Sequence, residues 1–145
     1  MNQPSPANPT LREQLAAPRR FITLYGTTPP RAAAPPEQIA AAADRLTQRV
    51  RDLKLDGLVV YDVQDEGART DAPRPFPFLP TAESRAYARL LQQRSGLTAI
   101  SYKCVIDMSE AGWRNWLAET RAEYGVDHLA LVGSATPNRA AIAGG

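Results

Sequence analysis

Short apolar stretches alternate with longer amphipathic ones along this chain. The short stretches are rich in β-branched and aromatic residues, which is typical of strands buried on both faces of a sheet. They lie at residues 21–25, 58–61, 99–106 and 128–132. Gly26 and Gly133 directly follow the first and the last stretch and are expected to end those strands.

Between the strands, apolar residues recur at steps of three and four, which is the period of an amphipathic helix. The first helical pattern opens at Pro35-Pro36-Glu37, the second has Thr81 as its expected N-cap, and the third has Ser109. Gly96 and Gly125 are natural ends for the last two helices. The inner faces are expected to hold Ile39, Ala43, Leu46, Val50, Leu53, Tyr87, Leu90, Leu91, Trp113, Trp116, Leu117, Thr120 and Tyr124.

The alternating order of four strands and three helices predicts an α/β fold. Strands joined through helices by right-handed crossovers form a parallel sheet. Residues 21–137 are expected to form this unit. Residues 1–20 are expected to be a flexible, Pro-rich tail, with a short helix at residues 11–16 as an alternative, and residues 138–145 a second flexible tail.

Composition limits the classes of function that suit the chain. Its 145 residues, 43% of them hydrophobic, suffice for one domain with a buried core. A formal net charge of +2, evenly spread, argues against binding to nucleic acid or to a membrane. No secretion signal or membrane-spanning run is predicted, and a single cysteine, Cys104, excludes an internal disulfide. We therefore expect a soluble, cytoplasmic protein.

Several common catalytic motifs are absent from the sequence. There is no Gly-x-Gly-x-x-Gly turn after a strand, no phosphate loop with Lys-Ser/Thr, no His-Glu-x-x-His pair and no Gly-x-Ser-x-Gly elbow. No metal site is expected.

Ligands of a parallel α/β sheet bind to the loops at the carboxyl ends of the strands. The candidate loops begin at Gly26, Asp62, Cys104 and Gly133. The second is long and holds four prolines, which is typical of a lid or an insert. Arg69 precedes these prolines, and Arg74, Phe76 and Phe78 lie between them. Arg69 is a candidate for contact with an anionic ligand group, whereas the two phenylalanines either stack on a ligand ring or, as we favour, pin the loop to the next helix.

Asp62 and Glu66, with Asp65 and Asp107, are the candidates for acid–base chemistry. Desolvation raises the pKa of a carboxyl group, which can then donate a proton. Alternatively these carboxylates cap the next segment or pair with Arg69 and Lys103, and Lys103 would need such a partner if it were buried. Cys104 is expected to be buried as a small hydrophobe and His128 to be structural.

Three segments resemble the methylenetetrahydrofolate reductase family. Tyr25-Gly26-Thr27-Thr28-Pro29-Pro30-Arg31 is similar to that family's strand-one motif, Phe-Glu-Phe-Phe-Pro-Pro-Arg. Ser95-Gly96-Leu97, leading into a strand that ends at Ile106-Asp107, is similar to its third unit. Residues 124–133 are similar to its fourth unit, Gly-Ile-x-His-Ile-x-Ala-Leu-Arg-Gly-Asp. Order and spacing agree from residue 21 to residue 137.

The resemblance implies a (βα)8 TIM barrel that binds FAD at the carboxyl ends of its strands and uses NAD(P)H to reduce methylenetetrahydrofolate. With about four parallel strands and three helices, this chain would be the amino-terminal half of that barrel, partial and not closed. The cofactor-binding positions would be Gly26, Tyr61, Tyr102, Gly133 and Ser134. The substrate-binding positions would be Thr28 and Arg69.

The same alignment replaces residues that carry the family's chemistry. The catalytic Glu falls on Gly26, the Asp and Arg of the fourth motif on Ser134 and Val132, and the His of the third strand on Tyr102. Asp62 or Glu66 would then supply the missing acid.

Three functions therefore stay open for the chain. It is a flavin-dependent reductase of folate metabolism, a non-redox module that holds a pterin or a small anion, or an inactive half that needs a second half-barrel. In each case both outer strands are exposed edges, so we expect self-association or pairing with a second half.

Overall fold

The computed structural model describes residues 9–17, 20–63, 79–105 and 108–133. The α/β fold predicted from the sequence is confirmed, and the short helix near the amino terminus is present. In chain order the elements are α1 (Leu11–Ala16), β1 (Leu24–Thr27), α2 (Pro36–Val50), β2 (Gly57–Val60), α3 (Ser84–Ser95), β3 (Ala99–Cys104), α4 (Glu110–Ala122) and β4 (His128–Val132).

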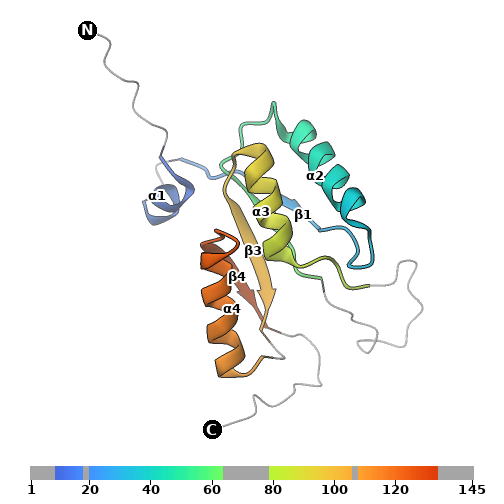
Figure 1. Cartoon of the computed structure of the whole chain (residues 1–145). Coiled ribbons are helices and arrows are strands. Elements are labelled where there is room, and N and C mark those ends of the chain that lie inside the picture. Colours follow the sequence, from blue (N-terminus) through green and yellow to red (C-terminus); the bar gives the residue numbers. More distant parts are fainter. Residues whose placement is uncertain (1–8, 18–19, 64–78, 106–107, 134–145) are drawn as a thin grey trace, which may run out of the picture.

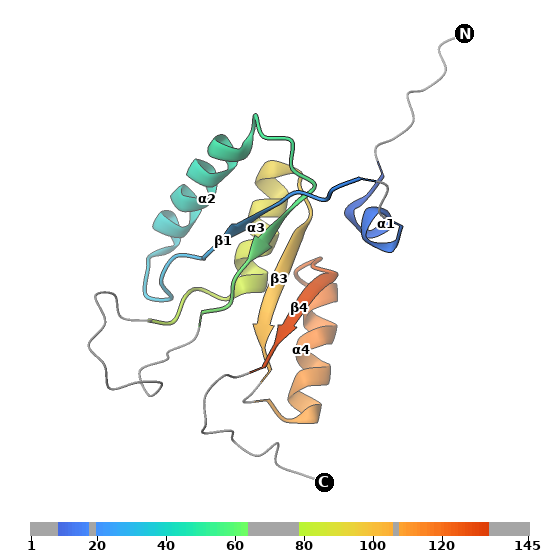
Figure 2. The ribbon, with the colours of Figure 1, turned by 180° about the vertical axis from the view of Figure 1, so that it is seen from behind.

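The four strands form one open parallel sheet in the order β1-β2-β3-β4. Helices α2, α3 and α4 lie side by side on one face of this sheet (Figure 1). From behind, the strands lie in front of these helices, so the opposite face of the sheet carries none of the three (Figure 2). The sheet therefore has a helix-covered face and an open face. Its placement within an eight-stranded barrel stays a prediction.

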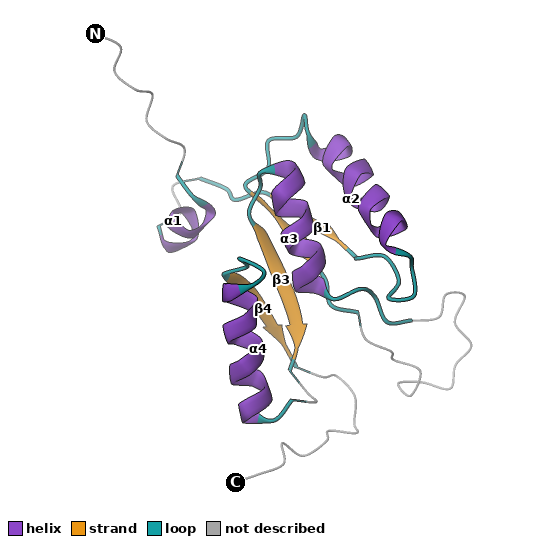
Figure 3. Cartoon of the chain, viewed as in Figure 1, coloured by secondary structure: helices purple, strands orange, loops and turns teal. Residues whose placement is uncertain are grey.

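The sheet and its helices form two layers (Figure 3), and the main cluster of buried side chains lies between the sheet and helices α2 and α3. Leu58 and Val60 of β2 are completely buried, and they pack with Leu46 of α2 and with Tyr87 and Leu91 of α3. Burial of such a side chain contributes about 1.5–3 kcal/mol. The sequence predicts strands buried on both faces, but α2, α3 and α4 all cover the same face, so that prediction is wrong for this sheet. Val59, on the other face of β2, is nevertheless only 9% exposed.

The outer boundaries of two elements differ from the sequence prediction. β1 begins at Leu24 rather than at Phe21, which is 96% exposed, because the segment before Leu24 is tied to the Asp56 side chain. Gly26 lies inside β1 and does not end it. α3 begins at Ser84 because the backbone N–H of Thr81 instead donates to the Val63 carbonyl oxygen.

Most of the predicted helix ends are confirmed. Gly96 is the C-cap of α3, as predicted, whereas α4 ends at Ala122, three residues before Gly125, with Glu123 as its C-cap. Both glycines adopt positive φ angles, 72° and 59°, which favour glycine. The Ser109 hydroxyl accepts a hydrogen bond from the Gly112 N–H at 3.2 Å and caps α4. Two residues predicted for inner faces are exposed instead: Leu53 by 49%, beyond the end of α2, and Leu117 by 37%, on the rim of α4.

Helix α1 lies against the amino end of the sheet. Its first residue, Leu11, is 3% exposed, and its side chain lies close to Gly57 at the start of β2. A capping box between Thr10 and Glu13 fixes the start of this helix. Within the described ranges, no helix is long and apolar enough to cross a bilayer.

Candidate functional site

Tyr61 and Tyr102 lie side by side at the carboxyl end of the sheet. Val60 is in register with Ser101, so the residues that follow them are also neighbours. The two rings are 5.1 Å apart between centroids, at an interplanar angle of 80°, which is a favourable edge-to-face contact. Tyr61 is 40% exposed. Side chains alternate along a strand, and Val60 packs in the core, so both rings belong to the open face.

The Tyr61 ring fits beside the neighbouring strand β1 because residue 26 is a glycine. A Cβ atom at Gly26 would lie 2.5 Å from the Tyr61 Oη atom and 2.9 Å from its Cε2 atom. The phenol therefore occupies the space that a side chain at position 26 would fill. Here glycine is required by a close approach rather than by a turn. We call Gly26, Tyr61 and Tyr102 the tyrosine platform; three predicted cofactor-binding residues thus come together.

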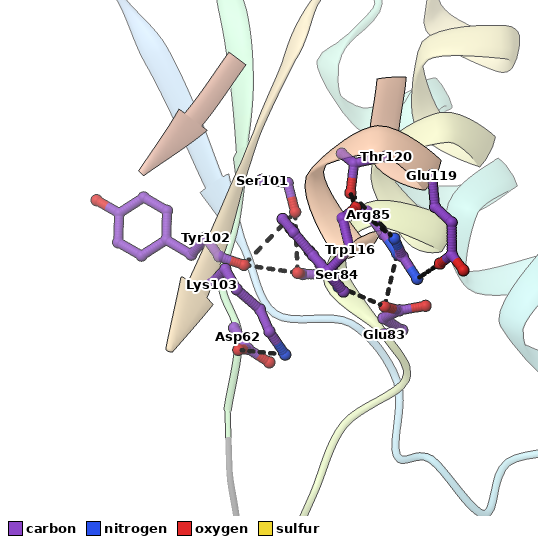
Figure 4. A network of polar contacts seen from close by, with 10 residues as sticks. All are labelled: Asp62, Glu83, Ser84, Arg85, Ser101, Tyr102, Lys103, Trp116, Glu119 and Thr120. Carbon is purple, nitrogen blue, oxygen red and sulfur yellow. Dashed lines mark hydrogen bonds and ion pairs between the residues drawn. The ribbon is translucent and has the colours of Figure 1, made fainter. Parts of the chain in front are cut away.

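Asp62 lies on the other side of the sheet, toward the helices. Its Oδ2 atom accepts a hydrogen bond from the Cys104 N–H at 2.9 Å and lies 3.9 Å from the Lys103 Nζ atom. The Lys103 ammonium also lies 5.6 Å from the centroid of the Trp116 ring. Figure 4 shows the Tyr102 ring pointing away from Lys103 and Asp62. The alternative that Asp62 pairs with Lys103 is thus the one found; a catalytic role for Asp62 stays a prediction.

A buried serine pair holds the backbone that carries Tyr102. The Ser84 hydroxyl donates to the Tyr102 carbonyl oxygen at 2.6 Å, and the Ser101 hydroxyl donates to Ser84 Oγ at 2.9 Å (Figure 4). Both serines are at most 1% exposed. The platform is therefore supported from the helix-covered side by α3.

Arg85, one residue further along α3, joins that helix to α4. Its guanidinium donates to Glu83, to Glu119, to the Trp116 carbonyl oxygen and to the Thr120 hydroxyl, over 2.7–3.0 Å (Figure 4). The residue is 6% exposed, so these bonds satisfy a charge that would be costly to bury alone. Arg85 is not among the residues predicted from the sequence. The available signal was its spacing of two from Tyr87, an expected inner-face residue, and of three from Ala88, which is also buried.

The remaining candidates are more dispersed or cannot be placed. Thr28 is exposed just beyond β1, and Gly133 is exposed just beyond β4. Cys104 is half-buried rather than buried. His128 lies at the amino end of β4, away from the platform, with its Nδ1 atom 2.7 Å from Asp127 Oδ1. Outside the described residues lie Asp65, Glu66, Arg69, Arg74, Phe76, Phe78, Asp107 and Ser134.

The platform suits a flat heterocycle. Tyrosine rings stack against planar ligands, and phenol hydroxyls donate or accept hydrogen bonds at their edges. In the part of the chain that the structure describes, the register places no carboxylate at the carboxyl end of the open face. The same part contains no cluster of three metal-ligating side chains.

Comparison with known proteins finds a similarity to solved structures. A solved structure, described as an uncharacterized protein from Clostridium thermocellum that binds two copies of 5-methyl-5,6,7,8-tetrahydrofolic acid, superposes with a TM-score of 0.66 and 26% sequence identity. The similarity covers 86% of this chain and 38% of that chain, so this chain spans well under half of its neighbour. No family model and no curated protein sequence matches the chain. The similarity to methylenetetrahydrofolate reductases stays a resemblance.

Proposed function

We propose that this chain binds a reduced folate on the open face of its sheet, with the pteridine ring against the tyrosine platform. The observation that carries the proposal is the contact between the exposed Tyr61 ring and the half-buried Tyr102 ring at the carboxyl ends of parallel strands, where α/β sheets bind their ligands. A similar fold in a protein described as binding methyltetrahydrofolate supports the choice of ligand.

The proposal is tested by calorimetric titration of the purified chain with 5-methyltetrahydrofolate. Stacking of a base on an aromatic side chain is worth about 1–3 kcal/mol, so Tyr61→Ala and Tyr102→Ala should each weaken binding by about fivefold or more. The matched variants Tyr61→Phe and Tyr102→Phe keep the rings and should retain most of the affinity.

Gly26→Ala provides a third variant, since the new methyl group must displace the Tyr61 ring. The displaced atoms are at the exposed end of a side chain, so folding should be little affected while affinity falls. Unchanged dissociation constants in all the alanine variants, or no binding by the natural chain, would contradict the proposal.

Flavin-dependent reduction of methylenetetrahydrofolate with NAD(P)H is the second candidate function. It is favoured by the similarity around Pro29-Pro30-Arg31, and the platform suits a flavin ring as well as a pterin. Bound FAD would supply hydride transfer from NAD(P)H to the substrate. Reduction also consumes a proton, for which Glu66 is the predicted donor, because Asp62 is paired on the helix-covered side.

The two candidates are separated by one pair of measurements. The absorbance spectrum of the protein after addition of FAD reports flavin binding, and NAD(P)H oxidation in the presence of methylenetetrahydrofolate reports turnover. Glu66→Gln should abolish turnover and leave folate binding intact if the reductase proposal is right. Folate binding with neither flavin uptake nor NAD(P)H oxidation would leave the non-redox function.

A further inference from the structure

A second recess lies beside the carboxyl end of β1, on the helix-covered side of the sheet. Thr27, one of its lining residues, is in register with the core residue Val60, so it faces the helices rather than the tyrosine platform. The cavity has a volume of about 210 Å³. Its lining consists of Thr27, Thr28, Pro30, Ala42, Arg45, Leu46, Arg49 and Tyr87.

The charge of this cavity is positive and uncompensated. Arg45 and Arg49 lie one turn apart on α2, both are exposed, and neither has an ion-pair partner within the described part of the chain. The nearby Asp44 is already paired with Arg94. Like charges four residues apart destabilise a helix by a few tenths of a kcal/mol. An anion between the two guanidinium groups would relieve this repulsion.

Neutral hydrogen-bond donors complete the lining. Thr27 and Thr28 each contribute a hydroxyl group from the end of β1. Tyr87 is 3% exposed, and in the described residues its hydroxyl makes no hydrogen bond. Burial raises the pKa of Tyr87, although the positive charges of Arg45 and Arg94 oppose the shift, so the phenol stays protonated and can donate. Guanidinium and hydroxyl donors without a carboxylate are the set that recognises an oxyanion.

We propose that this cavity, lined by Arg45, Arg49, Thr27, Thr28 and Tyr87, binds the phosphate or carboxylate group of a small molecule. Its volume is below the roughly 300–1,000 Å³ typical of sites for drug-sized ligands, so it suits a single oxyanion rather than a whole ring system. Because the cavity and the tyrosine platform lie on opposite faces of the sheet, this site does not depend on folate binding.

The test is isothermal titration of the full chain in about 0.1 M salt, where charges are screened beyond about 10 Å, with inorganic phosphate and, separately, with glutarate. A hydrogen bond to a charged group is worth about 1.5–3 kcal/mol, so the double variant Arg45→Gln/Arg49→Gln should bind at least about tenfold more weakly. Tyr87→Phe removes only the hydroxyl and should cause a smaller loss. A preference for phosphate or for glutarate identifies the class of oxyanion.

The control variant Arg12→Gln/Arg121→Gln removes the same charge from two exposed arginines that have no ion-pair partner in the described chain. It should bind within about twofold of the natural chain, since attraction at long range is screened. Circular dichroism of all variants checks that folding is retained. The proposal is overturned if neither anion binds the natural chain, if the Arg45/Arg49 variant binds normally, or if the control loses as much affinity.

Discussion

At the scale of single residues, the relation between Gly26 and Tyr61 explains an apparent loss in the sequence. The resemblance aligns an acidic residue with Gly26, which would leave that position without a functional side chain. In the structure the Tyr61 phenol, from the next strand, lies in the space next to Gly26. A polar group is therefore present at this point of the open face, but it comes from a different strand and is a neutral hydrogen-bond donor.

The contacts of another residue, Asp56, predict how the stability of the protein depends on pH. Hydrogen bonding to the Arg20 guanidinium, and then to the Thr23 backbone N–H at 2.8 Å, lowers the pKa of Asp56. A lowered folded-state pKa gives stability that is present above the unfolded value of about 3.9 and is lost as pH falls through the folded value. Urea denaturation from pH 7 downward should therefore show an acid loss of stability that is smaller in Asp56→Asn.

At neutral pH, Asp56→Asn should be the less stable protein, because the ionised carboxylate is the form that Arg20 and Thr23 bind. Parallel stability curves for the two proteins across the acid range would show that the contacts of Asp56 contribute little.

At the scale of elements, α3 and α4 are joined by one buried arginine. Arg85→Ala should lower the free energy of unfolding by about 2–3 kcal/mol, since breaking a buried ion pair costs about 3–5 kcal/mol and the carboxylates of Glu83 and Glu119 are partly exposed here. The change is measured as a shift of the urea midpoint.

Arg114→Ala is the matched control, because Arg114 pairs with Glu110 within α4 and both side chains are at least 75% exposed. Exposed pairs of this kind contribute under about 1 kcal/mol. Similar losses of unfolding free energy in the two variants would mean that Arg85 stabilises the fold no more than an exposed arginine does. Because Ser84 precedes Arg85 in α3, Arg85→Ala should also loosen the hydrogen bond between Ser84 and the Tyr102 carbonyl oxygen. The variant should therefore bind the proposed ligand of the platform more weakly.

At the scale of the whole molecule, the sheet formed by the described residues is open at both edges. Among these residues, β1 and β4 each have a neighbouring strand on one side only, and Leu131 of β4 is 55% exposed. Unpaired edges are templates for pairing with another chain. We predict that the chain self-associates at micromolar concentration, as measured by light scattering after size-exclusion chromatography.

Leu131→Lys places a charge at the exposed edge and should shift the equilibrium toward monomer, since lysine on an edge strand opposes pairing. The exposed Leu15 of α1, 49% accessible, offers a control in Leu15→Lys, which should leave the mass unchanged. A monomeric natural chain across the concentration range would contradict self-association and, with it, the expected pairing with a second half.

Much of the fold could be predicted because it depends on local pattern. The apolar run at Leu58–Val60 predicts the central strand, although helices cover only one of its faces, and the three- and four-residue spacing of Ala43, Leu46 and Val50 predicts the buried side of α2. Ser109 and Gly96 mark helix ends by their own chemistry. Gly26, by contrast, suggested a strand end, since a sequence does not show that a neighbouring ring needs the space.

By itself the sequence determined the order of the elements, the parallel α/β class and the edge of the sheet at which the loops after the strands gather. These features depend on hydrophobic periodicity and on turn residues, which act over a few positions along the chain. Only the tertiary structure decided which side chains share a face. Neighbouring strands placed Tyr61 over Gly26 and beside Tyr102, turned Asp62 toward Lys103, and brought Arg45 and Arg49 to the end of β1. These contacts join residues far apart in the chain, and register and packing fix them.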